Sequence, residues 1–210
     1  MPDLSTVALF VTASVVLLVV PGPTIALVIA RSLSDGGRTA LPLVLGVGLG
    51  DLVAAAVSLA GAGALLAASA TAFTAVKVVG ALYLVWLGVR LFRAAPEPPR
   101  PVEAAVTGGE IGAFRDGFLV TVFNPKGILF FVAFVPQFID PARGYAVQAA
   151  FFAITFTALA LANGAVYAFG AVAMRRAVRD LGVLRAMNRV GGATIAVAGV
   201  AALFARRPAA

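Results

Sequence analysis

The stretch Phe123-Asn124-Pro125-Lys126-Gly127 interrupts an apolar run that opens near Phe118 and continues to Ile139. Proline lacks a backbone N–H and its ring collides with the preceding helical turn, so this run cannot form one unbroken helix. Asparagine is a favoured N-cap and proline is favoured at the first helical position. The pattern therefore predicts that one helix ends here and that a second begins at Pro125. Lys126 then lies in the first turn of that second helix.

A broken helix that carries a charge inside a hydrophobic span needs a protein partner or a water-filled cavity. We therefore interpret Asn124, Pro125 and Lys126 as part of a binding site. The alternative is a simple proline kink, with the Lys126 side chain extending to the membrane surface.

The composition is that of a membrane protein. Hydrophobic residues make up 61% of the 210 residues, charged residues make up 12%, and the mean hydropathy is +1.03. These values lie outside the soluble range and predict a single transmembrane domain over residues 1–210. The net charge of +7 comes from basic residues between apolar runs, which is typical of membrane topology, so we expect no nucleic-acid partner.

The chain has no Cys and no His. Thiol–disulfide chemistry, haem ligation by His and most transition-metal sites are thereby excluded. Catalysis by Ser-His-Asp or Cys-His arrangements is excluded for the same reason. We therefore expect no cofactor and no bound metal.

The first apolar run, Leu4 to Ala30, contains a second interruption at Pro21-Gly22-Pro23-Thr24. No Lys or Arg precedes Arg31, so the run is interpreted as a retained membrane helix rather than a secretory signal. Gly22 can end one half-helix and Pro23 can begin another, as Asn124 and Pro125 do in the second half.

A second span is expected from about Thr39 to Leu66. Within it Gly46, Gly50, Ala54 and Ser58 recur at four-residue spacing. On a helix such small residues form one face, which predicts close packing against another helix.

Asp51 is the only charged residue between Arg38 and Lys77. A carboxylate at the centre of a membrane helix costs about 2.5–3.5 kcal/mol on insertion scales, so it needs a partner, a proton or water. We predict a direct role for Asp51 in ion or substrate coupling. The alternative is a structural ion pair, with either Lys77 or Lys126 as the partner. Without such a pair, Lys77 would extend outward to the membrane surface.

Six membrane spans are predicted in all, over about residues 4–30, 39–66, 72–91, 118–139, 145–174 and 190–204, and an earlier start near Met187 is an alternative for the last of them. A hydrophilic linker, Ala94 to Gly112, separates the third span from the fourth. Asn163 lies in the middle of the fifth span, where it would either bond across helices or contact a substrate.

Eleven of the sixteen Lys and Arg residues fall in the loops that join spans one and two, three and four, and five and six. The positive-inside rule puts these loops in the cytoplasm and both termini outside it. Three spans per half is an odd number, so the second half must insert upside down. The predicted fold is therefore all-α, with two inverted three-helix repeats over about residues 4–93 and 113–206, each beginning with a broken helix.

In such a repeat the two broken helices meet near the membrane midplane. Half-helices that restart at Pro23 and Pro125 would direct free N–H groups, near Thr24 and Lys126, into one cavity that favours a carboxylate. Lys126 adds a full positive charge, and Asp51 supplies a negative group for an ammonium or a proton. Opposite charges in one site describe a receptor for a zwitterion such as an amino acid.

Four motifs carry a resemblance to a known family: Pro21-Gly22-Pro23, Gly46-Val47-Gly48-Leu49-Gly50-Asp51, Gly80-Ala81-Leu82-Tyr83-Leu84-Val85-Trp86-Leu87-Gly88, and Gly117-Phe118 with Asn124-Pro125-Lys126. Together they resemble the LysE/RhtB family of bacterial amino-acid exporters. The resemblance implies an exporter of amino acids or close derivatives in the bacterial inner membrane, driven by the proton motive force and able to form a homodimer. It carries the family's motif positions over to Pro21, Gly22, Pro23, Gly50, Asp51, Asn124, Pro125 and Lys126.

Other functions fit the same features less well. An exporter of another small solute or of a hard cation would use the same scaffold, with oxygen ligands for the cation. A membrane enzyme would need a nucleophile or an acid–base pair at the interface, and the deep polar groups here are mainly amides, hydroxyls and lysines. A channel or a purely structural scaffold would not need broken helices in inverted repeats.

Overall fold

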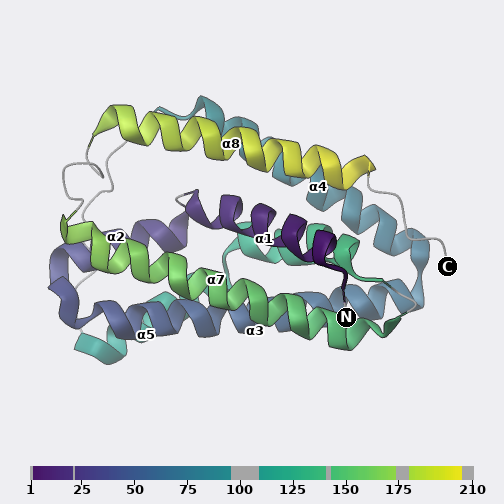
Figure 1. Cartoon of the computed structure of the whole chain (residues 1–210), viewed down its shortest axis with the longest axis horizontal. Helices are drawn as coiled ribbons and strands as arrows, with labels where there is room; N and C mark the ends of the chain where they lie inside the picture. Colours follow the sequence, from purple (N-terminus) through teal and green to yellow (C-terminus); the bar gives the residue numbers. More distant parts are fainter. Residues whose placement is uncertain (1, 21, 96–108, 141–142, 174–179, 205–210) are drawn as a thin grey trace.

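The computed structural model describes residues 2–20, 22–95, 109–140, 143–173 and 180–204. All regular secondary structure within these ranges is helical, and the helices run roughly along one long axis (Figure 1). The elements are α1 (Leu4–Val19), α2 (Pro23–Asp35), η1 (Gly36–Arg38), α3 (Ala40–Ala68), α4 (Ala70–Arg93), α5 (Gly109–Val122), α6 (Pro125–Leu129), η2 (Phe130–Phe134), η3 (Val135–Phe138), α7 (Tyr145–Ala173) and α8 (Leu181–Phe204).

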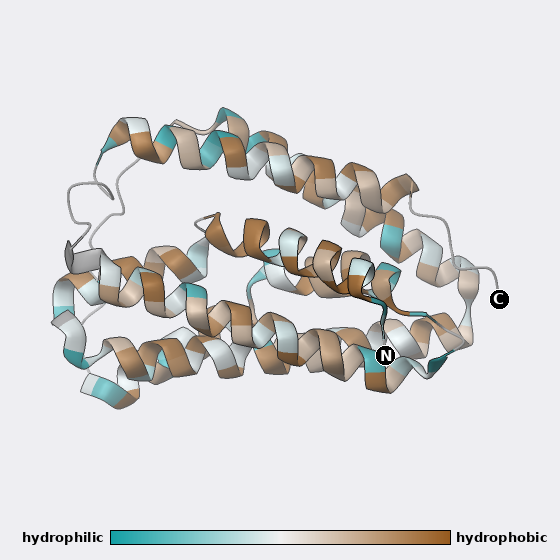
Figure 2. Cartoon of the chain, in the orientation of Figure 1, coloured by the Kyte–Doolittle hydropathy of each residue, from teal (hydrophilic) through white to brown (hydrophobic). Residues whose placement is uncertain are grey.

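Four of the described helices, α3, α4, α7 and α8, are each long and apolar enough to cross a membrane. Two further spans result if each bent pair is counted as one, α1 with α2 at 53° and α5 with the segment from α6 to η3 at 43°. Figure 2 shows hydrophobic residues along the whole length of most helices. The chain is thus an all-helical membrane protein with four to six candidate spans in the described ranges.

Both breaks lie where the sequence predicts them. In the first half α1 ends at Val19 and α2 begins at Pro23, while Pro21 lies outside the described residues. In the second half α5 ends at Val122 and α6 begins at Pro125. Asn124 caps α6, because its side-chain oxygen accepts a hydrogen bond from the Lys126 N–H at 3.1 Å.

The segment after α6 is irregular, which the sequence analysis did not anticipate. A π-helical turn, η2, is followed by a 3₁₀ turn, η3. Pro136 lies at the start of η3 and has no N–H to donate, so the regular α-helical ladder cannot continue through it. Phenylalanine rings pack around the irregular turn, with Phe131 against Phe156 at 4.8 Å between ring centroids.

The last helix is longer than predicted. α8 begins at Leu181, whereas the sequence analysis placed the start of the span at about Val190, with Met187 as the earlier alternative. Asp180 provides the reason, because its carboxylate accepts hydrogen bonds from the N–H groups of Gly182, at 2.7 Å, and Val183, at 3.1 Å. This is an N-cap, and it starts the helix several residues ahead of the apolar run.

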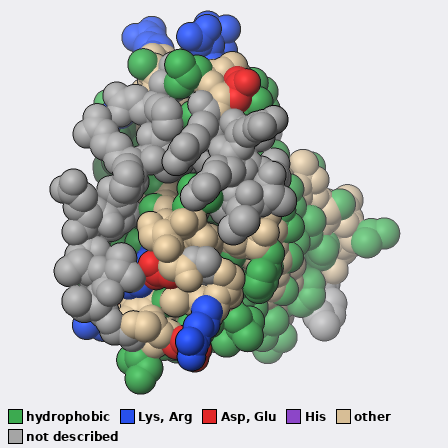
Figure 3. Space-filling model, turned by 90° about the vertical axis from the view of Figure 1, so that its left-hand side faces the viewer, with side chains coloured by type: hydrophobic (Ala, Val, Ile, Leu, Met, Phe, Trp, Pro, Cys, Tyr) green, Lys and Arg blue, Asp and Glu red, His purple; other side chains and the backbone are tan. Residues whose placement is uncertain are grey.

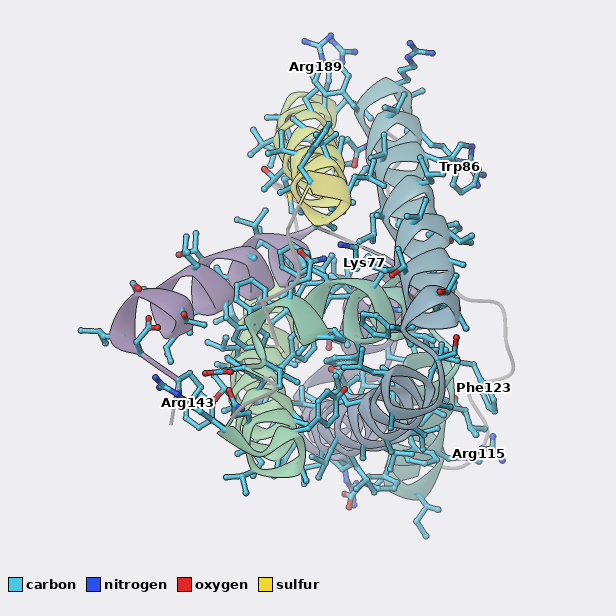
Figure 4. All side chains as sticks on the ribbon, turned by 90° about the vertical axis from the view of Figure 1, so that its right-hand side faces the viewer. Lys77, Trp86, Arg115, Phe123, Arg143 and Arg189 are labelled. Carbon is cyan, nitrogen blue, oxygen red and sulfur yellow. The ribbon has the colours of Figure 1, made fainter. Side chains whose placement is uncertain are left out.

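Two arginines that the sequence analysis assigned to a loop therefore lie on the first turns of α8. Arg185 and Arg189 are both exposed, and Figure 4 shows Arg189 extending away from the bundle. Because they are four residues apart, they share one face of the helix and can reach polar surroundings while the opposite face stays packed. Similarly, α5 begins at Gly109, inside the expected linker, because Gly112 and Ala113 are buried in the bundle.

Glycines allow the closest helix pairs to form. At the α3–α5 contact, a Cβ added to Gly46 would collide with the carbonyl oxygen of Phe114. A Cβ added to Gly50 would lie 2.8 Å from the carbonyl oxygen of Phe118. The α4–α8 contact has the same character, since a Cβ on Gly88 or Gly192 would collide with backbone atoms of the facing helix. Such contacts let the backbones of membrane helices approach closely.

A buried ion cluster joins α2 to α5. Arg31 is 5% exposed and pairs through one guanidinium nitrogen with Asp35 at 2.7 Å and through another with Asp116. Two carboxylates therefore neutralise the charge of Arg31, which the sequence analysis counted among the basic residues that set the membrane orientation. Figure 3 shows further basic side chains at the same end of the molecule, with acidic side chains beside them.

Candidate functional site

The two breaks meet at a small cavity of about 30 Å³. The end of α1, the start of α2, and residues from α3, α6 and α7 surround it. Its lining includes all five residues that the sequence analysis assigned to substrate or ion binding: Thr24, Asp51, Asn124, Lys126 and Asn163. Gly22 also lines the cavity, and a Cβ added there would lie 3.5 Å from the Lys126 ammonium nitrogen.

Lys126 points inward and ties the second break to the first. Its Nζ donates hydrogen bonds to the backbone carbonyls of Leu17, at 2.7 Å, and Val20, at 2.9 Å. The last carbonyls of a helix have no partner within the helix, and the negative end of the helix dipole favours a cation. The alternative in which Lys126 extends to the membrane surface is therefore wrong. By contrast, its neighbour Phe123 is 72% exposed and points away from the bundle (Figure 4).

Helix α7 caps the same end of α1. The Asn163 amide donates to the Leu18 carbonyl at 3.1 Å, and the Tyr167 hydroxyl donates to the Val19 carbonyl at 2.8 Å. Together with Lys126, these side chains provide donors for four consecutive carbonyls, Leu17 to Val20. The sequence analysis missed Tyr167, although its position four residues after Asn163 places it on the same face of α7.

Side-chain hydrogen bonds also join the start of α2 to the second break. Asn124 Nδ2 donates to Thr24 Oγ1 at 3.1 Å, and the Thr121 hydroxyl donates to the same oxygen at 3.4 Å. All three side chains are buried. The sequence analysis did not identify Thr121, because a threonine inside an apolar helix commonly bonds its own backbone.

Asp51 extends from α3 into the cavity and is 7% exposed. Lys126, which carries the opposite charge, lines the same cavity. Within the described part of the chain, Asp51 has neither a hydrogen bond nor an ion pair within 4 Å. A buried carboxylate in this situation depends on a proton, on water or on a ligand for its stability.

The structure does not pair Asp51 with Lys77. Only Ser69 separates the end of α3 from the start of α4, so the two helices turn back tightly. Asp51 lies 18 residues before Ser69 and Lys77 lies 8 after it, so at about 1.5 Å per residue their depths differ by about 15 Å. Figure 4 shows Lys77 extending from α4 toward the space below α8, and it does not line the cavity.

The site combines a cation, a carboxylate, hydroxyls and amides in a nearly closed space. A cavity of about 30 Å³ has room for little more than water, whereas ligand pockets typically measure about 300–1,000 Å³. The helices must therefore separate before a small organic ligand can enter. Among the residues that the structure describes, no group of three or more Asp, Glu, His or Cys gathers to hold a metal ion.

The model of the LysE type translocator family matches residues 15–206, which include both breaks and every residue of the small cavity. The chain belongs to the LysE type translocator family. This membership confirms the resemblance inferred from the motifs, and it indicates a membrane transport protein rather than an enzyme.

The similar proteins include membrane proteins and efflux proteins. An uncharacterized membrane protein of Vibrio cholerae is 33% identical over 188 residues, which cover 87% of this chain and 89% of the relative. A leucine efflux protein of an Enterobacter species is 30% identical over 131 residues, 62% of each chain. One from Salmonella typhimurium is 30% identical over 133 residues, also 62% of each chain. No solved structure matches the chain.

Proposed function

We propose that this LysE type translocator exports amino acids or close derivatives across the bacterial plasma membrane, in exchange for protons. The observation that carries the proposal is the buried cavity in which the Asp51 carboxylate and the Lys126 ammonium face each other. Opposite charges at the crossing of two broken helices suit a zwitterion better than a simple anion or cation. The names of the leucine efflux relatives make leucine the first substrate to test.

In this proposal Lys126 holds the substrate carboxylate. A lysine ammonium has three N–H donors, and two of them bond to the carbonyls of Leu17 and Val20. The third is available to a ligand in the cavity. The Thr24 side chain lies in the same lining, at the start of α2, where free backbone N–H groups favour an anion.

Asp51 couples the substrate to the proton. The carboxylate can hold either the substrate ammonium or a proton, and the two compete for the same negative charge. A proton that arrives from outside the cell would displace the ammonium and release the substrate there. After the site reopens to the cytoplasm, loss of the proton would restore the charge that binds the next substrate.

The pattern of helix contacts supports two inverted repeats, over about residues 4–93 and 113–206, joined by a cytoplasmic linker. The packing of α3 on α5 corresponds to the packing of α7 on α1 and α2. Likewise, α4 packs on the fourth span through α6 and η2, and α8 packs on the first span through α1, while the α3–α7 and α4–α8 pairs each join equivalent helices. A two-fold axis in the membrane plane relates such pairs, and rocking of one repeat against the other would open the cavity to each side in turn.

The substitution Asp51→Asn tests the proposal. Purified protein in liposomes should accumulate labelled leucine, or another amino acid from a panel, when a pH difference is imposed. Asp51→Asn should abolish this accumulation, because the amide cannot carry a proton between the two sides. A thermal unfolding temperature in detergent equal to that of the wild type serves as the control for a folded protein. Full pH-driven accumulation in the variant would show that the coupling proton binds elsewhere, and uptake of no amino acid by the wild type would refute the substrate class.

A further inference from the structure

A second and much larger cavity, of about 640 Å³, lies between α1, α8 and the irregular segment η2–η3. Its lining is mainly apolar and includes Leu9, Leu17, Phe130, Val197 and Ala198. Leu17 also lines the small polar cavity, so the two cavities share a wall. The larger cavity extends from that wall toward the end of the bundle at which α1 begins and α8 ends (Figure 1).

The cavity opens sideways between two membrane helices. Leu9 on α1 is 65% exposed and Val197 on α8 is 66% exposed, although both line the cavity. Apolar side chains that are exposed along a membrane-spanning helix face the hydrocarbon of the bilayer. The opening therefore leads into lipid.

The length of the cavity matches one leaflet. On α1 its lining runs from Thr6 to Leu17, a separation of eleven residue steps that spans about 16 Å at about 1.5 Å per residue. Half of a typical hydrocarbon core is about 15 Å. The deep end of the cavity therefore lies near the midplane and the outer end near the headgroups.

The polar residues of the lining lie mainly at its outer end, at the level expected for the headgroups. Gln137 and Asp140 line the cavity beside Ile139 at the end of η3, near the helix ends, whereas Leu17 and Phe130 line the deep end. Two threonines lie between. The hydroxyl of Thr12 bonds the Ala8 carbonyl, and that of Thr194 bonds the Val190 carbonyl, so neither needs a polar ligand in the cavity.

We propose that the acyl chain of a membrane phospholipid occupies this cavity, with its headgroup at the level of Gln137 and Asp140. An apolar space of this volume gives water no partners, and an acyl chain gains favourable burial with every methylene that enters it. A zwitterionic substrate would find no counter-charge along the deep part of the lining. The proposal requires only that the helices lie in a membrane, and it is independent of the transport proposal.

Native mass spectrometry of protein extracted from membranes in mild detergent tests this site. The wild type should retain one phospholipid more than the variant Ala198→Phe, in which the new ring fills the cavity. The lipid-bound fraction of that variant should fall at least about tenfold, because the buried methylenes that contribute to binding are displaced. Val79→Phe is the matched control, since Val79 is 65% exposed on α4 and does not line the cavity, so its lipid count should equal that of the wild type.

A second variant, Ala13→Leu, fills the same cavity from α1 and replaces Ala198→Phe if that protein does not fold. Equal lipid retention in the wild type and in both cavity variants would overturn the proposal. So would a wild type that is dimeric and free of lipid, with the cavity variants monomeric, because a second copy of the chain would then be the occupant. An equal loss of lipid from Val79→Phe would also overturn it, since the lipid would then not be held at this cavity.

Discussion

Two hydrogen bonds from the Lys126 ammonium to the carbonyls of Leu17 and Val20 make this side chain part of the fold as well as part of the candidate site. The end of α1 depends on them, because its carbonyls have no helical partners and lie deep in the protein. The same charge faces Asp51 across the cavity. Loss of Lys126 should therefore affect both stability and binding, and the two effects can be measured separately.

Lys126→Gln should lower the free energy of unfolding by about 1–3 kcal/mol, because buried carbonyls lose a charged donor. Its dissociation constant for an amino acid should rise about ten- to a hundredfold, whereas that of the analogue with an amidated carboxyl should change little. Thermal unfolding in detergent and ligand binding by calorimetry measure the two effects. Lys126→Arg keeps the positive charge but replaces the ammonium with a larger guanidinium group, so it should restore binding only in part.

Lys77→Gln is the matched control, because it removes the same charge from α4, away from the cavity. We expect it to bind the amino acid as the wild type does. An equal loss of affinity for the acid and its amide in Lys126→Gln would rule out the carboxylate role. An unchanged unfolding temperature would instead rule out the capping role at the end of α1.

At the scale of helices, the contact between α3 and α5 depends on the absence of side chains. The backbone of α5 passes directly over Gly46 and Gly50. A methyl group at Gly46 cannot be accommodated by a rotamer change, because the atom that it would meet belongs to the Phe114 backbone. Asp51 follows Gly50 on the same helix, so a shift of α3 would also move the carboxylate in the cavity.

Gly46→Ala should therefore destabilise the protein by about 1–3 kcal/mol, the usual cost of overpacking, and should reduce transport as well. Gly61→Ala is the control on the same helix, because nothing lies within 4 Å of an added Cβ there. Alanine favours a helix over glycine by about 1 kcal/mol, so Gly61→Ala should be neutral or stabilising. Thermal unfolding of the two variants provides the comparison. Equal stability of Gly46→Ala and Gly61→Ala would show that α3 and α5 can move apart without a loss of stability.

Much of this arrangement could be predicted from the sequence. Proline chemistry located both helix breaks, and the apolar runs located the spans, because both signals are local. The sequence also assigned Thr24, Asp51 and Lys126 to one site, and the structure brings them to one cavity. The start of α8 was missed because the Asp180 cap precedes a polar turn with no apolar signal. The capping of α1 by Tyr167 was missed because it depends on tertiary contacts.

For the molecule as a whole, the orientation in the membrane depends on which basic side chains are not neutralised by a carboxylate in the folded protein. Arg31 should contribute little, because Asp35 and Asp116 neutralise it. In contrast, Arg185 and Arg189 remain exposed at the start of α8. Ten of the sixteen basic residues still lie, by their positions in the sequence, in or next to the three connections that the sequence analysis placed in the cytoplasm. The positive-inside rule therefore predicts the same orientation with Arg31 left out.

Reporter fusions test that orientation. Alkaline phosphatase, which folds only outside the cytoplasm, should be active when fused after Ala210, and a green fluorescent protein inserted in the linker that follows Ala94 should fluoresce. The reciprocal fusions should both be silent, which controls for expression. Replacing both Arg185 and Arg189 by Gln should weaken the bias without removing it, because the remaining loops keep their charges. Activity of the two reporters in the reversed pattern would place both termini in the cytoplasm. The large cavity beside α1 would then lie in the inner leaflet, and the proton would enter from the opposite face.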